Sequence, residues 1–117
     1  MTTQVLESIS ATLPPGHREL RFKVTGSLDR RSACRFVKSL RSAEEREPSR
    51  LTIDLQRCSF LDVVGACILL DAARRARGEG RRLALAAPPP LVRRMLQLTA
   101  VDRVVEMEPA APEAAAA

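Results

Sequence analysis

Short stretches in which apolar and polar residues alternate recur along the chain. Leu20–Val24, Leu51–Leu55 and Arg82–Ala86 have this two-residue period, which is typical of strands with one buried face. Two further short strands are predicted at Val5–Ile9 and Val104–Met107. The intervals between the three central strands are long enough to hold helices, so neighbouring strands can run parallel.

Apolar residues recur at helical spacing in three of the intervening segments. These positions are Ala33, Phe36, Val37, Leu40 and Ala43 in the first, Ala66, Leu69, Leu70 and Ala73 in the second, and Leu91, Val92, Met95, Leu96 and Leu98 in the third. Asp29 and Asp62 precede the first two segments and are predicted N-caps, because an aspartate side chain accepts hydrogen bonds from the free N–H groups of a first turn. The order of elements predicts an α/β fold, with helices packed against a mainly parallel sheet of four to five strands.

Length and composition are those of one globular domain. The chain has 117 residues, of which 45% are hydrophobic and 28% charged, a balance that supports a single core. We expect residues 18–107 to form the domain and residues 1–17 to form an N-terminal segment with one short strand. Residues 108–117, rich in Ala and Pro, are expected to be a disordered tail.

Few residues carry the chemistry that an enzyme needs. Cys34, Cys58 and Cys67 are widely spaced among apolar neighbours and are predicted to lie in the core. His17 is the only histidine, so neither a zinc site nor a histidine-based triad is expected. Asp54 and Asp62 could act as paired carboxylates, but no histidine or phosphate-binding glycine loop accompanies them. We therefore expect no enzymatic activity, metal or cofactor.

The net charge of +5 raises nucleic acid as a partner. The densest basic group lies between Arg74 and Arg82. Proteins that bind single strands combine such charge with stacking aromatic side chains, whereas Phe22, Phe36 and Phe60 are the only aromatic residues here and fall at predicted core positions. Nucleic acid is therefore not an expected partner, and binding that weakens steeply with salt would be the sign that it is one.

Four motifs resemble, in the same order, the motifs of one family. They are the turn Thr25–Asp29, the strand and loop Leu51–Gly65, the turn Gly78–Gly80 before a strand, and the helix Pro90–Arg103. Together they cover about residues 20–107 and are similar to STAS domains, the fold of anti-sigma factor antagonists. The resemblance implies the STAS fold and a non-enzymatic, cytoplasmic regulator of transcription that acts by binding another protein.

In STAS antagonists, a serine at the start of the second helix is phosphorylated by the partner, an anti-sigma factor that resembles a histidine-kinase ATPase. Unphosphorylated antagonist binds this partner, and phosphorylated antagonist releases it. In the present chain Val64 stands at the serine position and Gly65 matches the motif glycine. Because valine cannot be phosphorylated, the usual switch is predicted to be absent. Ser59 is the alternative hydroxyl in the same connection.

The resemblance also implies a contact surface, built around the motif loop and the second helix. Carried over to this chain, it comprises Asp62, Val63, Val64, Gly65 and Ile68, with Thr25, Ser27 and Asp29 beside them. Exposed valines would be apolar anchors for a partner, whereas buried valines would be packing residues of a first helical turn. The sequence leaves both interpretations open.

A second class of function follows from the same resemblance. Small STAS proteins are also similar to accessory subunits of lipid-transporting ABC systems, which dock on an ATPase at a membrane and would tolerate the missing serine. Insertion of this chain into the bilayer is not expected, because no apolar run approaches the ~20 residues that a spanning helix needs. No signal peptide is evident either. Formation of a homodimer stays open.

Overall fold

Strands and helices alternate over most of the chain. The computed structural model describes residues 4–10 and 19–108. Its elements are β1 (Gln4–Ser10), β2 (Glu19–Leu28), α1 (Ala33–Glu44), β3 (Arg50–Leu61), α2 (Val63–Gly78), β4 (Arg82–Ala86), α3 (Pro90–Leu98), a 3-10 helix (Val101–Arg103) and β5 (Glu106–Glu108). The domain boundaries expected at residues 17 and 107 stay predictions, and His17 and the tail from Pro109 lie outside the described residues.

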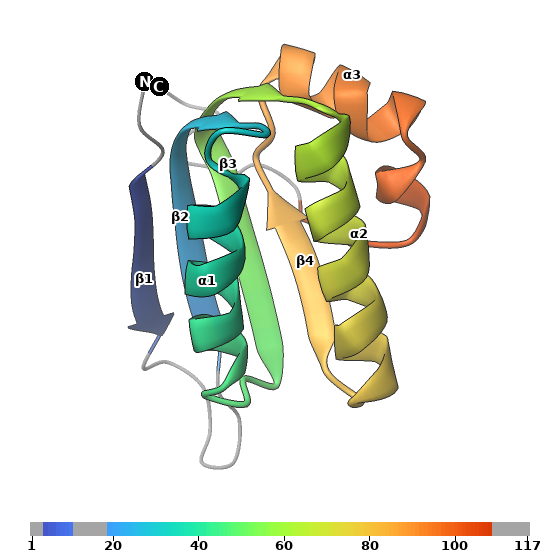
Figure 1. The fold of residues 1–117 in the computed structure, drawn as a ribbon. Helices are drawn as coiled ribbons and strands as arrows, with labels where there is room; N and C mark the ends of the chain where they lie inside the picture. Colours follow the sequence, from blue (N-terminus) through green and yellow to red (C-terminus); the bar gives the residue numbers. More distant parts are fainter. Residues whose placement is uncertain (1–3, 11–18, 109–117) are drawn as a thin grey trace, which may run out of the picture.

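The five strands form one sheet in the order β1-β2-β3-β4-β5. β1 is antiparallel to β2, and the other neighbouring pairs are parallel. Figure 1 shows α1 and α2 side by side across one face of the sheet, while α3 lies beside the end of β3. The predicted fold class, an α/β fold with a mainly parallel sheet, is confirmed.

The core lies between the sheet and the helices. The rings of Phe22 on β2 and Phe36 on α1 are fully buried and meet edge to face, with centroids 5.7 Å apart, a favourable geometry for aromatic pairs. Alternate residues of β3, Leu51, Ile53 and Leu55, are buried in the same core. The two-residue period therefore identified the inward face of β3 correctly, but the prediction of a single buried face was wrong. Thr52 and Asp54 on the other face of β3 are buried too, and in β4 every residue after Arg82 is buried.

β3 is longer than predicted. The sequence indicated a strand at Leu51–Leu55 followed by a connection to Leu61, but β3 runs to Leu61 and β2 runs to Leu28. The pairing of these two strands shifts register twice, between Lys23 and Thr25 and between Gly26 and Ser27. Such irregularities interrupt the strict alternation of buried side chains, so the far halves of both strands do not look like strands in the sequence.

The last strand and several burial predictions were also wrong. The strand expected at Val104–Met107 is β5 at Glu106–Glu108, because the backbone N–H groups of Val104 and Val105 bond to the carbonyl of Val101 in the turn that ends the 3-10 helix. Of the cysteines only Cys58 is buried, and Cys34 and Cys67 lie on exposed sides of α1 and α2. Phe60 is 41% exposed rather than in the core. Val37, Leu91 and Leu98 share the apolar stripes predicted for their helices, but their side chains are exposed.

Within the described residues, no helix is long and apolar enough to cross a membrane.

Candidate partner-binding site

Asp62 fixes the start of α2. Its carboxylate Oδ1 accepts a hydrogen bond of 2.9 Å from the backbone N–H of Gly65, and its backbone is extended, as expected of an N-cap residue. Its backbone carbonyl accepts the first helical bond, from Ala66 N–H at 2.9 Å. The predicted cap is confirmed at this helix, so the residues after Asp62 are held in the first turn of α2.

Gly65 allows α2 to approach the sheet closely. A Cβ atom at this position would lie 2.6 Å from Cδ1 of Leu61 and closer still to the carbonyl oxygen of Leu28. Leu28 and Leu61 are themselves buried at the ends of β2 and β3. No side chain fits between the helix and the strand ends, so steric crowding explains why glycine stands at this position of the motif.

The turn after β2 is tied to the same place. The other carboxylate oxygen of Asp62, Oδ2, accepts a hydrogen bond of 3.3 Å from the backbone N–H of Arg30, and Asp62 N–H donates to the carbonyl of Leu28 at 3.3 Å. A single aspartate therefore bonds to both the first turn of α2 and the turn between β2 and α1.

Asp29 stabilises this turn, although it does not cap α1 as predicted. The helix begins at Ala33 with Ser32 as the N-cap residue. Asp29 Oδ1 accepts from the backbone N–H groups of Arg31 at 2.9 Å and Ser32 at 3.2 Å. In return Ser32 Oγ accepts from Asp29 N–H at 3.0 Å. This reciprocal pair has the pattern of a capping box one turn early, and the spacing Asp-x-x-Ser was the signal in the sequence that could have identified Ser32.

Apolar side chains are exposed at the start of α2. Val63 is 60% and Val64 37% exposed, and Phe60, at the end of β3, is 41% exposed. This favours the interpretation of the valines as surface residues. Ile68, which was expected to extend the exposed surface, is half-buried and packs against the core.

The remaining predicted residues lie at the end of β2. Thr25 and Ser27 are half-buried residues of this strand, on either side of Gly26, whose φ of 96° is in the region that favours glycine. The carbonyl of Ser27 accepts a hydrogen bond of 2.8 Å from Ser32 Oγ. Ser59 lies on β3 and is exposed. The same end of the sheet thus holds the predicted turn residues and the start of α2.

Reactive groups are not gathered at this surface. Asp54 Oδ2 pairs with Arg21 at 3.4 Å, and its Oδ1 accepts from Gln56 N–H at 3.0 Å, so each aspartate of the proposed carboxylate pair has its own structural partners. Burial raises the pKa of the Cys58 thiol, whose Sγ lies 3.3 Å from the carbonyl of Phe60. No group of three or more metal-ligating side chains occurs within the described ranges.

Comparison with known proteins supports a family assignment. Residues 15–106 match the family model described as Mlab, STAS domain. An anti-sigma factor antagonist from Mycobacterium paratuberculosis has a similar structure, with a TM-score of 0.75 and 23% identity over 97% of this chain and 92% of that one. The anti-sigma factor antagonist SpoIIAA is similar in its unphosphorylated form, with a TM-score of 0.71 and 20% identity over 95% and 93% of the two chains. SpoIIAA of Bacillus in its phosphorylated form has a TM-score of 0.65 and 19% identity over 95% and 96%.

Proposed function

Since the chain belongs to the STAS-domain family of the MlaB type, we propose that it is a non-enzymatic regulatory module of the cytoplasm. In this proposal it binds a kinase-like anti-sigma factor, as an anti-sigma factor antagonist would. The contact surface is the start of α2, comprising Asp62, Val63, Val64 and Gly65, with the turn after β2 beside it. The similar structures named as antagonists support the type of role.

The exposure of Val63 and Val64 is the observation that carries this proposal. These two neighbouring apolar side chains are exposed in the first turn of α2, and the position of that turn is fixed by Asp62 and Gly65. Apolar side chains on rigid elements are suited to anchor a partner, because little conformational freedom is lost when they are covered. Phe60 adds a third exposed apolar side chain beside them in the sequence.

The proposal includes loss of the usual phosphoswitch. A helix N-terminus tolerates a phosphate well, and a phosphate of about −1.5 to −2 charges would repel an apolar or acidic partner. Val64 occupies the position at which the family has the phosphorylated serine, and it has no hydroxyl. We expect the protein to remain in the state that binds its partner.

Replacing Val64 by Asp tests both ideas, since it places a negative charge where the family places phosphate. We expect the affinity for the captured partner to fall about tenfold or more, because one apolar contact is lost and a charge is left buried at the interface. Affinity would be measured by titration after the partner has been captured from the native cells. Val104→Asp is the matched control, since Val104 is 49% exposed and lies after the 3-10 helix. Equal affinities of the two variants would remove the start of α2 from the interface.

The accessory subunit of a lipid-transporting ABC system is the second candidate. The absence of a hydroxyl at Val64 favours it, because a subunit that docks permanently needs no phosphoswitch. The same capture, carried out separately on soluble and membrane fractions, separates the two candidates. Mass spectrometry would find a kinase-like ATPase in the first case, and permease and transporter ATPase subunits in the second.

A further inference from the structure

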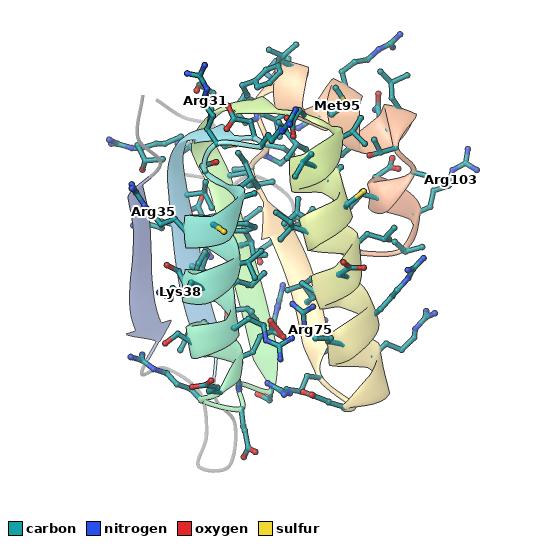
Figure 2. The ribbon with its side chains drawn as sticks, viewed as in Figure 1. Arg31, Arg35, Lys38, Arg75, Met95 and Arg103 are labelled. Atoms are coloured by element: carbon teal, nitrogen blue, oxygen red, sulfur yellow. The ribbon has the colours of Figure 1, made fainter. Side chains whose placement is uncertain are left out.

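One side of α1 carries a row of cations. Arg31, in the turn before the helix, and Arg35, Lys38 and Arg41 within it are all exposed, and we call these four residues the basic stripe. Their spacing of four, three and three residues places them on one side of a helix. Figure 2 shows Arg31, Arg35 and Lys38 along the edge of α1 that faces away from α2. Glu45, the C-cap residue, is the first acidic residue beyond the stripe on this side.

The stripe lacks the carboxylate partners that other arginines have. Arg75 forms two hydrogen bonds to the Glu44 carboxylate, at 2.9 and 2.7 Å, and the pKa of Arg75 is raised chiefly by these bonds. By contrast, no carboxylate among residues 19–108 forms an ion pair with any of the four cations of the stripe. Like charges one turn apart destabilise a helix, so a complementary acidic surface would relieve a repulsion that the isolated chain retains.

The stripe adjoins the proposed contact surface. Arg30, the residue before Arg31, donates its backbone N–H to Asp62, the cap of α2. An open hollow of about 820 Å³ runs beside α1, and its described lining residues include Arg35, Val37, Lys38 and Arg41. The stripe therefore lies along a depression beside α1, and its first residue, Arg31, follows the residue that bonds to the cap of α2. A partner that covers the valines could reach the stripe at this end.

We propose that the basic stripe is a docking face for an acidic α-helix of the partner protein. This inference rests on the proposed function for the identity of the partner, and it adds the chemistry of the partner's surface. The cations recur once in each helical turn of about 5.4 Å. A second helix with Glu or Asp at the same interval presents one carboxylate to each cation when it lies alongside α1.

A membrane and a nucleic acid are less well matched to this face. A helix that lies in a bilayer surface inserts an apolar side, whereas Phe36, Leu40 and Ala43 of α1 are buried in the core of the protein. A nucleic acid would be attracted by the charge. The stripe, however, consists of three arginines and one lysine, with no aromatic side chain on which bases could stack. Both serve as competing probes in the test.

The test uses the purified full-length chain and a synthetic alanine-based helix whose glutamates repeat the spacing of the stripe. A control peptide has the same composition with its glutamates distributed around the helix. Lys23 and Lys38 are the only lysines of the sequence, so a carbodiimide, which joins an amine to a nearby carboxylate, reports the place of binding. We expect crosslinks at Lys38 and few at Lys23, which is exposed on β2, and affinity about tenfold higher than for the control peptide.

Four variants complete the design. Arg35→Glu combined with Arg41→Glu should weaken binding about tenfold or more, whereas Arg93→Glu with Arg94→Glu, two exposed arginines of α3, should not. Lys38→Arg should keep the affinity and lose the crosslink. Val104→Asp, at an exposed position after the 3-10 helix, should leave peptide binding unchanged. Because the peptide assay does not use the captured partner, a failure of the proposed function at α2 is distinguishable from a failure here. Equal binding of the control peptide, equal crosslinking at Lys23, or tighter stripe-dependent binding of anionic vesicles or duplex DNA would overturn the proposal.

Discussion

At the scale of single residues, two kinds of position meet at the start of α2. Gly65 has no room for a side chain, whereas the side chains of Val63 and Val64 are exposed to solvent. Gly65 faces the ends of β2 and β3, where the carbonyl of Leu28 and the side chain of Leu61 fill the space. Val63 and Val64 precede it in the same turn and point away from that packing. Because Gly65 lets α2 pack closely against the ends of β2 and β3, it fixes the position of the two exposed valines.

Gly65→Ala should lower the free energy of unfolding by about 1–3 kcal/mol, because the new methyl group would overlap packed atoms of the strand ends. Urea denaturation measures the change. Gly78→Ala is the control, since a Cβ atom there would meet nothing within 4 Å, and alanine at a helical position should leave stability unchanged or raise it by up to about 1 kcal/mol. If the two variants were equally stable, the close approach at Gly65 would be refuted.

Residue identity alone predicted some of the site and missed the rest for physical reasons. Asp62 was identified correctly, because capping is a local interaction that the sequence order reveals. Phe60 and Cys67 were misplaced, because their exposure depends on which side of an irregular strand or a helix meets the core. Ser32 was missed, since its hydroxyl bonds within the turn that directly precedes α1 rather than to the first turn of the helix.

At the scale of elements, Asp62 joins two segments that are far apart in the sequence. Replacing it by Ala should cost about 1–2 kcal/mol of stability, because α2 loses its cap and the turn after β2 loses an acceptor. Asp62→Asn should cost less, since an asparagine oxygen still accepts from Gly65 N–H. Thermal and urea unfolding measure both variants. Asp71→Ala, at an exposed position of α2, should stay within about 0.5 kcal/mol of the parent, and an equal loss there would contradict the role given to Asp62.

The order of elements was predictable, but the ends of the long strands were not. Hydrophobic periodicity located α1, α2, α3 and the first half of β3, because each of these has a regular inward face. It did not locate the 3-10 helix. The second half of β3 pairs with β2 through two register shifts, and these depend on Gly26 and on contacts between strands rather than on local preference. Ser59 and Phe60, just before the candidate site, lie in this second half, so sequence analysis placed them in a connection.

At the scale of the whole molecule, charge is arranged differently on the sheet and on α1. Arg21 pairs with Asp54 at 3.4 Å, Arg50 with Glu108 at 2.9 Å and Arg82 with Glu106 at 2.7 Å. These pairs connect β2, β3, β4 and β5, and they use carboxylates that the chain itself supplies. The cations of α1 that have no carboxylate partner among residues 19–108 are a feature of one face, and composition or net charge alone could not have located them.

The stability of the whole fold should depend on the Cys58 thiol above about pH 9. Burial raises the pKa of this thiol in the folded protein, while the unfolded chain ionises near the ordinary value of 9.0. Above that pH, unfolding releases a proton, so the stability contributed by the neutral thiol is present below pH 9 and is lost as pH rises toward the folded pKa, by up to about 1.4 kcal/mol per pH unit.

Urea unfolding of the parent and of Cys58→Ala between pH 7 and pH 10 measures this loss, with about one proton released per molecule as the expected difference. At neutral pH the parent should be the more stable protein, since the variant leaves a cavity in the core. The difference should shrink as the pH rises, because alanine has no proton to lose. Cys34, Cys67 and both lysines are present in the two proteins alike, so the comparison isolates Cys58. Stability curves that stay parallel up to pH 10 would show that the raised pKa of Cys58 does not contribute to the stability of the fold.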